Sequence, residues 1–225
     1  MPKSKRVATK VEDRFLDAAA RLFRRKGFEA TTVREIAKAA RMLPGSLHYR
    51  YPTKDSLLLA LMKRGEDADL VGIRAAIRDE RDPVERLRLA LRARLRYLLS
   101  RPASQVVLFE WRSLKGTARE EMIRLRDRYE AFWSGLLYEA AGTGRLHPGI
   151  DLRLLRFLLF GAINGVALWY HAAGPRTPDQ ISDAFWGFIA YGVVDEAHRP
   201  DDIGSALRTL SALERGTGEA EERPQ

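Results

Sequence analysis

The sequence predicts an all-α protein made of two helical parts. Apolar residues recur at the three- and four-residue spacing of helices through most of the 225 residues, and no strand-like alternation is long enough to compete. Proline and glycine residues separate these periodic segments, as they do between helices. The hydrophobic content of 45% is ample for a packed core.

Residues 1–11 are expected to form a flexible basic arm. A helix follows from about Glu12 to Lys26, with Gly27 as its C-terminal stop. Its apolar side chains fall on one face: Phe15, Ala18, Ala19, Leu22 and Phe23. This helix therefore has one side to bury against other elements.

A second helix is expected from Val33 to about Ala40. Thr32 can cap its first turn, and Glu35 stands at the capping-box spacing. The apolar residues again share one face: Val33, Ile36, Ala37 and Ala40.

A third helix, from Pro44 to Tyr51, is barely two turns long. Pro44 suits a first helical turn, where a missing N–H costs nothing, and Leu47 is the core anchor. Pro52 stops this helix and Thr53 caps the next. A short polar helix supported by an apolar one is the helix-turn-helix geometry, in which the second helix enters the DNA major groove.

Residues 15–61 resemble the DNA-binding domain of the TetR family of bacterial transcriptional repressors. RFLDAAARLFRRKGFEATTVREIAKAA resembles the first two helices of that domain, and PGSLHYRYPTKDSLL resembles its recognition helix and the cap of its fourth helix. Two positions depart from the family pattern. Arg41 stands where the family usually has a glycine, so Arg41 must adopt a left-handed conformation at ~1 kcal/mol, or the turn differs. His48 stands where the family usually has a phosphate-contacting tyrosine, and Tyr49 follows it.

The positive charge is concentrated in the same segment. Residues 1–64 hold 16 Lys and Arg against 6 Asp and Glu, a net charge of +10. The remaining residues hold 23 against 24, a net charge of −1. A basic part beside a neutral part is typical of a protein that binds phosphates at one end only.

Nine residues are candidates for DNA contact: Thr32, Arg41, Pro44, Gly45, Ser46, His48, Tyr49, Thr53 and Lys54. Those of the short third helix can reach bases, and its proline and glycine allow close backbone approach. Thr53 and Lys54 lie at the positive end of the fourth helix, where amides and ammonium together can hold a phosphate. Ordinary capping or surface solvation is the alternative for each residue.

The rest of the chain also reads as helical. Further helices are expected over residues 54–79, 83–100, 104–115, 118–141, 151–172 and 178–197, with a short tenth helix over 203–213. The expected domains are a helix-turn-helix DNA-binding domain over residues 12–64, an effector-binding and dimerisation domain over 65–215, and a disordered tail over 216–225.

The helix expected over residues 151–172 is apolar on nearly all sides and must therefore be buried on all sides. Its glycines, four residues apart, would let another helix approach closely, and the helix over 178–197 is similarly apolar. A two-fold four-helix interface between subunits is favoured over a monomer core. The interface candidates are Phe157, Gly161, Gly165, Leu168, Phe185, Trp186 and Ile189. Such a dimer places two recognition helices on successive turns of DNA, and TetR-like proteins dimerise in this way.

One arginine of the fifth helix, Arg94, lies inside its apolar stripe, whereas Arg88, Arg92 and Arg96 point away. A buried unpaired charge is too costly, so Arg94 needs an anionic partner. Two partners are possible for Arg94: Glu110, in a structural ion pair, or an effector anion bound in an aromatic-lined cavity. The candidate pocket residues are Arg94, Tyr97, Phe109, Glu110, Trp111 and Asn164.

Composition argues against several other classes of protein. The chain has no cysteine, its 4 histidines are scattered, and no P-loop or GxGxxG is present, so we expect no catalytic residues, metal or cofactor. The longest charge-free apolar run, residues 157–170, is shorter than the ~20 residues that span a bilayer. The N-terminus lacks the apolar core of a signal peptide. We therefore expect a cytoplasmic protein without a membrane partner.

The sequence favours a dimeric, ligand-responsive DNA-binding regulator, most simply a repressor that a small molecule releases from a palindromic operator. The segment from Asn164 to Tyr170, with Gly174 and Pro178, resembles the C-terminal region of TetR-family members that respond to acyl-CoA thioesters. This resemblance implies an acyl-CoA or hydrophobic acid as effector. A basic protein that binds nucleic acid without sequence choice and an all-helical enzyme are the alternatives.

Overall fold

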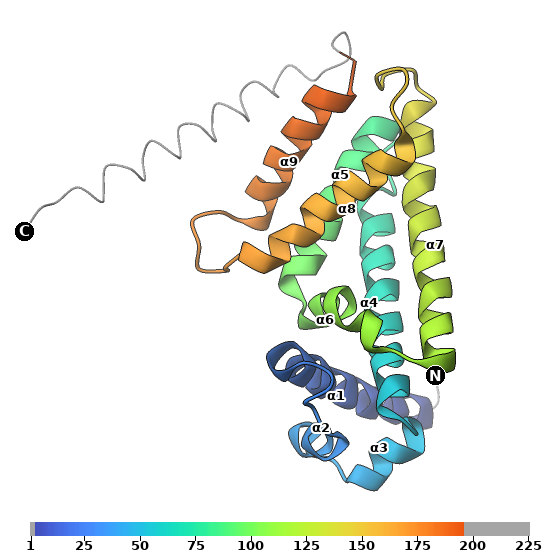
Figure 1. The fold of residues 1–225 in the computed structure, drawn as a ribbon, viewed down its shortest axis with the longest axis vertical. Coiled ribbons are helices and arrows are strands. Elements are labelled where there is room, and N and C mark those ends of the chain that lie inside the picture. The colour runs from blue at the N-terminus through green and yellow to red at the C-terminus, as the bar shows by residue number, and fades with distance from the viewer. Residues whose placement is uncertain (1–2, 196–225) are drawn as a thin grey trace, which may run out of the picture. The chain divides into compact units, whose positions relative to one another are not determined.

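The computed structural model describes residues 3–195, and the regular elements in this range are helices (Figure 1). The predicted all-α fold class is confirmed. In chain order the elements are α1 (Lys3–Lys26), α2 (Val33–Ala40), α3 (Pro44–Arg50), α4 (Lys54–Ala76), α5 (Pro83–Ser100), α6 (Pro102–Glu110), the 3₁₀ turn η1 (Trp111–Ser113), α7 (Gly116–Ala141), α8 (Leu152–Trp169) and α9 (Pro178–Val193). The tenth helix and the tail predicted after residue 202 lie outside the described residues.

Two segments differ from the prediction. The stretch predicted as an arm over residues 1–11 is helical from Lys3, because it contains no glycine or proline after residue 2 to interrupt the helix. The helix predicted over 104–115 is instead α6 followed by the tighter turn η1, and α7 then begins at Gly116, whose φ is +53°. The other helix ends fall within a few residues of their predicted positions.

The chain divides into two compact units, each made of two separate segments of the sequence. The first unit comprises residues up to 75 together with 97–132, and the second comprises 76–96 together with the residues from 133 onward. Helices α4, α5 and α7 each continue from one unit into the other. The functional division at residues 64 and 65 stays a prediction.

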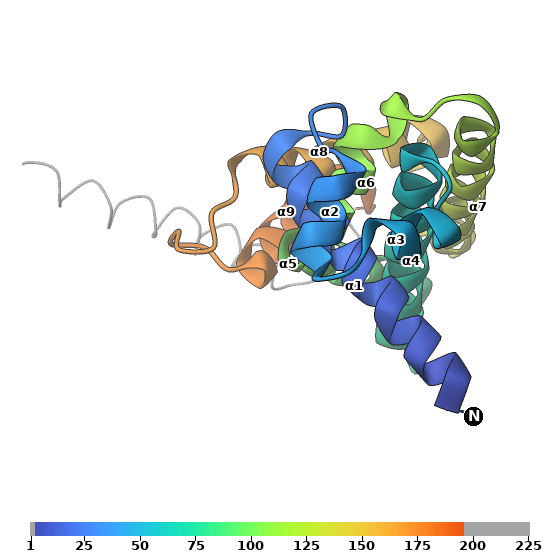
Figure 2. The same ribbon diagram turned by 90° about the horizontal axis from the view of Figure 1, so that it is seen from below.

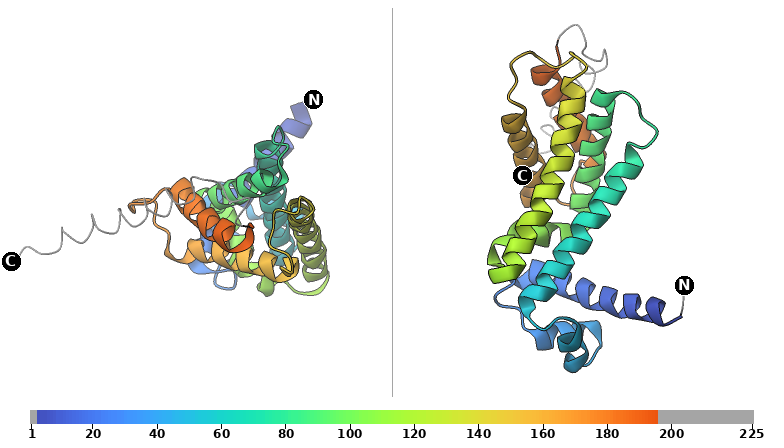
Figure 3. Two further views of the ribbon diagram at one scale, coloured as in Figure 1. Left: turned by 90° about the horizontal axis from the view of Figure 1, so that it is seen from above. Right: turned by 90° about the vertical axis from the view of Figure 1, so that its right-hand side faces the viewer.

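The first unit joins the predicted helix-turn-helix to α6 and the first half of α7. Its core contains side chains of α1, α2, α3 and α4, and also the buried Val106, Leu114, Met122 and Leu125. Figures 1 and 3 show α4 and the first half of α7 side by side. Lys63 pairs with Glu121 across these helices, and the Tyr129 hydroxyl donates to Asp69 Oδ2 at 2.6 Å. The helices of the predicted helix-turn-helix therefore share one core with elements more than 40 residues further along the chain.

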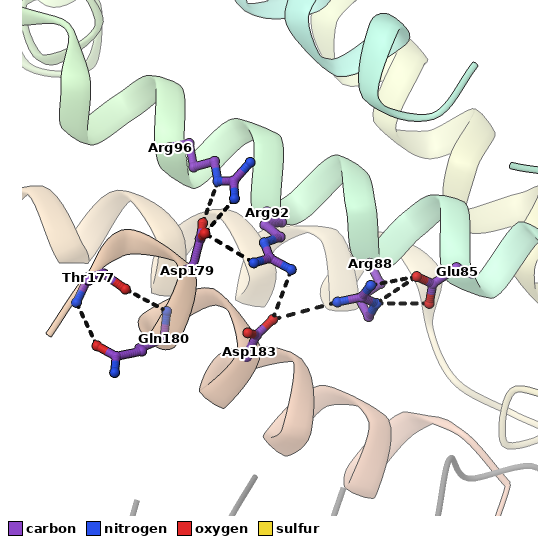
Figure 4. A network of polar contacts seen from close by, with 8 residues as sticks. All are labelled: Glu85, Arg88, Arg92, Arg96, Thr177, Asp179, Gln180 and Asp183. Atoms are coloured by element: carbon purple, nitrogen blue, oxygen red, sulfur yellow. Dashed lines mark hydrogen bonds and ion pairs between the residues drawn. The ribbon is translucent and has the colours of Figure 1, made fainter. Parts of the chain in front are cut away.

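The second unit is built around Trp133, which is almost fully buried and packs edge-to-face on Phe160 at 5.5 Å between ring centroids. Polar contacts join α5 to α9 (Figure 4). Arg96 and Arg92 both pair with Asp179, the latter at 3.0 Å, and Arg92 and Arg88 approach Asp183 at 3.8 and 3.6 Å. The arginines predicted to point away from the apolar stripe thus attach α9 to α5.

Candidate DNA-binding site

The site begins with α2, which starts with the predicted capping box. Thr32 Oγ1 accepts the Glu35 N–H at 3.2 Å, and Glu35 Oε2 accepts the Thr32 N–H at 2.9 Å. Lys26 Nζ donates to the same carboxylate at 2.5 Å. The bond from Lys26, supported by those from Thr32, lowers the pKa of Glu35 to about 2. The Thr32 side chain therefore has a capping role, and a phosphate contact by it stays a prediction.

The turn after α2 is left-handed at Arg41, with φ 54° and ψ 49°. This is the left-handed conformation, the first of the two outcomes predicted for this position. Among the described residues other than glycine, Arg41 alone has a positive φ. The Arg41 N–H donates to Lys38 O at 3.0 Å, and the Met42 N–H donates to Ala37 O at 3.0 Å. Arg14 adds a donor to Ala40 O at 2.7 Å. These bonds stabilise the turn and hold the start of α3.

Helix α3 projects from this frame with one buried anchor. Leu47 is fully buried, as predicted, while Tyr49 is 88% exposed. His48 and Gly45 are exposed, and Ser46 is half-buried. Figure 2 views the unit from the side on which α2 and α3 lie. Gly45, His48 and Tyr49 therefore lie on the open side of a short helix, whereas Ser46 is partly covered.

At the start of α4, Lys54 bonds to the turn between α1 and α2, and its phosphate contact stays a prediction. Thr53 caps the helix as predicted, since its Oγ1 accepts the Ser56 N–H at 3.0 Å. Lys54 Nζ, expected to hold a phosphate, donates to Phe28 O at 2.9 Å and Glu29 O at 3.1 Å. It also lies 4.3 Å from the Phe28 ring centroid. The ammonium thus stabilises the turn between α1 and α2.

Two further contacts, not foreseen from the sequence, attach the end of α6 and the loop before α7 to the helix-turn-helix. Glu110 Oε1 accepts the Phe28 N–H at 3.1 Å, and Asp55 Oδ1 accepts the Lys115 N–H at 3.1 Å. Glu110 is therefore bonded to a backbone amide of the first unit, and an ion pair with Arg94, one of the two alternatives for that arginine, stays a prediction. Bonds between residues 60 or more positions apart leave no local sequence signal.

The predicted pocket residues are divided between the two units. In the second unit, Arg94 Nη2 lies 3.4 Å from Asn164 Oδ1, so the structure brings these two candidates together. Tyr97, Phe109, Glu110 and Trp111 belong to the first unit, where Trp111 packs against the guanidinium of Arg126. A common pocket for all six stays a prediction. A cavity of about 160 Å³ between α7 and α8 has other lining residues: Ser134, Leu137, Tyr138, Leu152, Arg153 and Arg156.

The predicted dimer helices carry a large exposed apolar surface. Seven large hydrophobic residues on α8 and α9 are about half exposed or more: Leu154, Phe157, Leu158, Leu168, Trp169, Phe188 and Tyr191. A Cβ atom at Gly161 or Gly165 would meet no atom within 4 Å. Trp186 was predicted to lie in the dimer interface, but its side chain is only 7% exposed. It lies one turn from the buried Ala190, on the inner face of α9. By length and composition α8 also qualifies as a candidate membrane span, the one such helix in the described range.

Comparison with known proteins identifies the family. Residues 15–61 match the family model "Bacterial regulatory proteins, tetR family", and residues 80–193 match "Tetracyclin repressor-like, C-terminal domain". The chain belongs to the TetR family. The first match includes α2 and α3, and the second covers α5 to α9.

Relatives of this TetR-family protein are similar over most of its length. It is 31% identical over 186 residues to the HTH-type transcriptional repressor KstR2 of Rhodococcus jostii, covering 79% of this chain and 88% of that protein. It is 26% identical over 197 residues to KstR2 of Mycobacterium tuberculosis, covering 85% and 98%. Among solved structures, AibR in complex with isovaleryl coenzyme A and operator DNA has a TM-score of 0.71 at 28% identity, covering 79% and 97%. Family membership points to a transcription regulator rather than an enzyme.

Proposed function

We propose that this TetR-family regulator represses transcription as a homodimer that binds a palindromic operator through α3 of each subunit. The observation that carries the proposal is the open face of α3, where Tyr49 is 88% exposed and Leu47 is the buried anchor. This face lies in the segment with a net charge of +10. A recognition helix on a rigid frame, within a basic segment, has both requirements for reading DNA.

Selection from a randomised duplex library with the full-length protein tests this proposal. We expect a palindromic site whose half-sites lie one helical turn, or a multiple of it, apart. Affinity for that site should fall steeply with salt, since each neutralised phosphate adds about 0.9 to the slope of log K against log salt. Equal binding to unrelated duplexes at moderate salt would favour the non-specific alternative.

The exposed apolar surface of α8 and α9 supports the homodimer. A monomer rarely leaves so many large apolar side chains of two neighbouring helices uncovered, and the open positions at Gly161 and Gly165 allow a second helix to approach. A membrane is the less favourable occupant for α8, because the helix has 18 residues, includes Arg153 and Arg156, and is therefore shorter in apolar length than the ~20 residues that span a bilayer. We infer a cytoplasmic dimer that covers this surface.

The effector is proposed to be an acyl-CoA or a related hydrophobic acid. AibR, similar over most of the chain, was solved with isovaleryl coenzyme A and operator DNA. The neighbouring Arg94 and Asn164 offer a guanidinium and an amide for an anionic or carbonyl group.

Isovaleryl-CoA and longer acyl-CoAs are the probes for this proposal. A matching ligand should raise the melting temperature and weaken operator binding about 5- to 150-fold, the range of ordinary allosteric coupling. Arg94→Ala should lose that response while keeping ligand-free DNA binding. If Arg94→Ala only unfolds the protein, Arg94 has a structural role.

A further inference from the structure

Leu43, the residue directly before the recognition helix α3, is unusual for its position. Leu43 is the N-cap of α3, with φ −74° and ψ 140°, and its side chain makes no capping hydrogen bond. N-cap positions favour Ser, Thr, Asp and Asn, whose oxygens accept a free amide of the first turn. In the same chain Thr32, Asp151 and Thr177 cap α2, α8 and α9 in this way.

The Leu43 side chain is also exposed, at 75% of its surface. Its neighbour Met42 packs on the core that contains Leu47, the pairing expected of a hydrophobic staple, so Leu43 is not needed to fix the entry of the chain. Its backbone is held, since Leu43 O accepts the Ser46 N–H at 3.1 Å. A large apolar side chain is thus presented to solvent from an ordered position.

The residues that follow extend this apolar end of α3. Pro44 has no N–H, and the space beside Gly45 is open, with no atom within 4 Å of a Cβ placed there. A close approach by another surface is therefore allowed, and the surface that suits it is apolar. His48 and Tyr49 lie on the next turn of the same exposed helix.

In the major groove, the N-terminal residues of a recognition helix contact base edges. The thymine C5-methyl is the apolar group on those edges, and aliphatic side chains contact it. We propose that Leu43 is a specificity-determining residue that reads a thymine methyl in each operator half-site. This proposal rests on the proposed operator binding. It explains an uncapped, exposed leucine as a local cost recovered when Leu43 is buried against DNA.

The test removes one methyl group at a time from the DNA. The operator is first selected from a randomised duplex library with the full-length protein. Each thymine of the selected half-site is then replaced by deoxyuridine, which lacks only the C5-methyl. At one thymine per half-site, wild-type affinity should fall about fourfold, the value of one buried methyl-sized group at ~0.8 kcal/mol. Thymines elsewhere in the same duplex are the matched controls.

The corresponding change in the protein is Leu43→Ser. It introduces a side chain that can cap α3, so this variant should melt no lower than wild type. It should bind the thymine and deoxyuridine duplexes equally at the Leu43 position while keeping any methyl dependence due to other residues. Failure of the selection to return a preferred sequence would overturn the proposed function. A selected operator that shows no methyl dependence, or one that persists in Leu43→Ser, would overturn the role of Leu43 and leave the proposed function intact.

Discussion

Replacing Lys54 by alanine separates two roles for one ammonium group. In the structure Lys54 Nζ bonds to the carbonyl oxygens of Phe28 and Glu29 at 2.9 and 3.1 Å and lies over the Phe28 ring. Hydrogen bonds to charged groups contribute about 1.5–3 kcal/mol, and the side chain is 23% exposed, so water replaces part of the loss. We expect the free energy of unfolding to fall by about 1–2 kcal/mol. In a chain of this size that lowers the melting temperature by about 2–8 °C.

Calorimetry and DNA titrations at several salt concentrations measure the two roles independently. If Lys54 supports the turn between α1 and α2, the variant melts lower and binds DNA more weakly, but the salt slope is unchanged. If Lys54 neutralises a phosphate, its removal lowers the slope by about 0.9. Lys38→Ala, which removes an exposed charge from α2, is the control for charge alone. An unchanged melting temperature with a flatter salt dependence would refute the structural role of Lys54.

Three further predictions concern the rest of the protein. Leu168→Asp places a carboxylate on the exposed face of α8, so light scattering should give a monomer and operator affinity should fall at least about tenfold. Glu110→Ala leaves the Phe28 N–H without its acceptor and should lower the free energy of unfolding by about 1–3 kcal/mol in urea denaturation. The hydrogen bond from Arg96 holds the pKa of Asp179 well below its usual range, so its stabilisation is complete above pH ~4 and is lost as the pH falls. The difference in melting temperature between wild type and Asp179→Asn should therefore be constant from pH 7 to about 5 and shrink below about pH 4.

Each of these predictions has a matched control. Ile163→Asp, at a position only 4% exposed, should unfold the protein instead of dissociating it. Glu110→Gln keeps an acceptor for the Phe28 N–H and should recover part of the loss. Asp183→Asn removes only the longer contacts to Arg88 and Arg92 and should change the acid dependence less. The argument for α8 fails if Leu168→Asp is still a dimer, and the argument for Glu110 fails if Glu110→Ala is as stable as wild type. The argument for Asp179 fails if the difference in melting temperature between wild type and Asp179→Asn does not depend on pH.

Much of the candidate site was predictable because its determinants are local. The capping box of Thr32, the proline start of α3 and the burial of Leu47 depend on residues within a few positions of one another. The strained turn at Arg41 was one of two predicted outcomes, since a residue other than glycine must either adopt the left-handed conformation there or change the turn. Leu43 was readable as an apolar residue in an N-cap position, but its exposure needed the structure.

The sequence by itself determined the helices, the basic segment and the family, since periodicity, caps and charge are properties of short stretches of chain. Tertiary structure decided which partners these residues take. In the folded chain Lys54 donates to two carbonyl oxygens, and Glu110 accepts the Phe28 N–H. Trp186 is buried within its own chain. Tertiary structure also placed α6 and α7 in the core of the DNA-binding helices. Contacts between distant residues depend on how helices pack, and a helical repeat specifies the face that is buried without specifying what buries it.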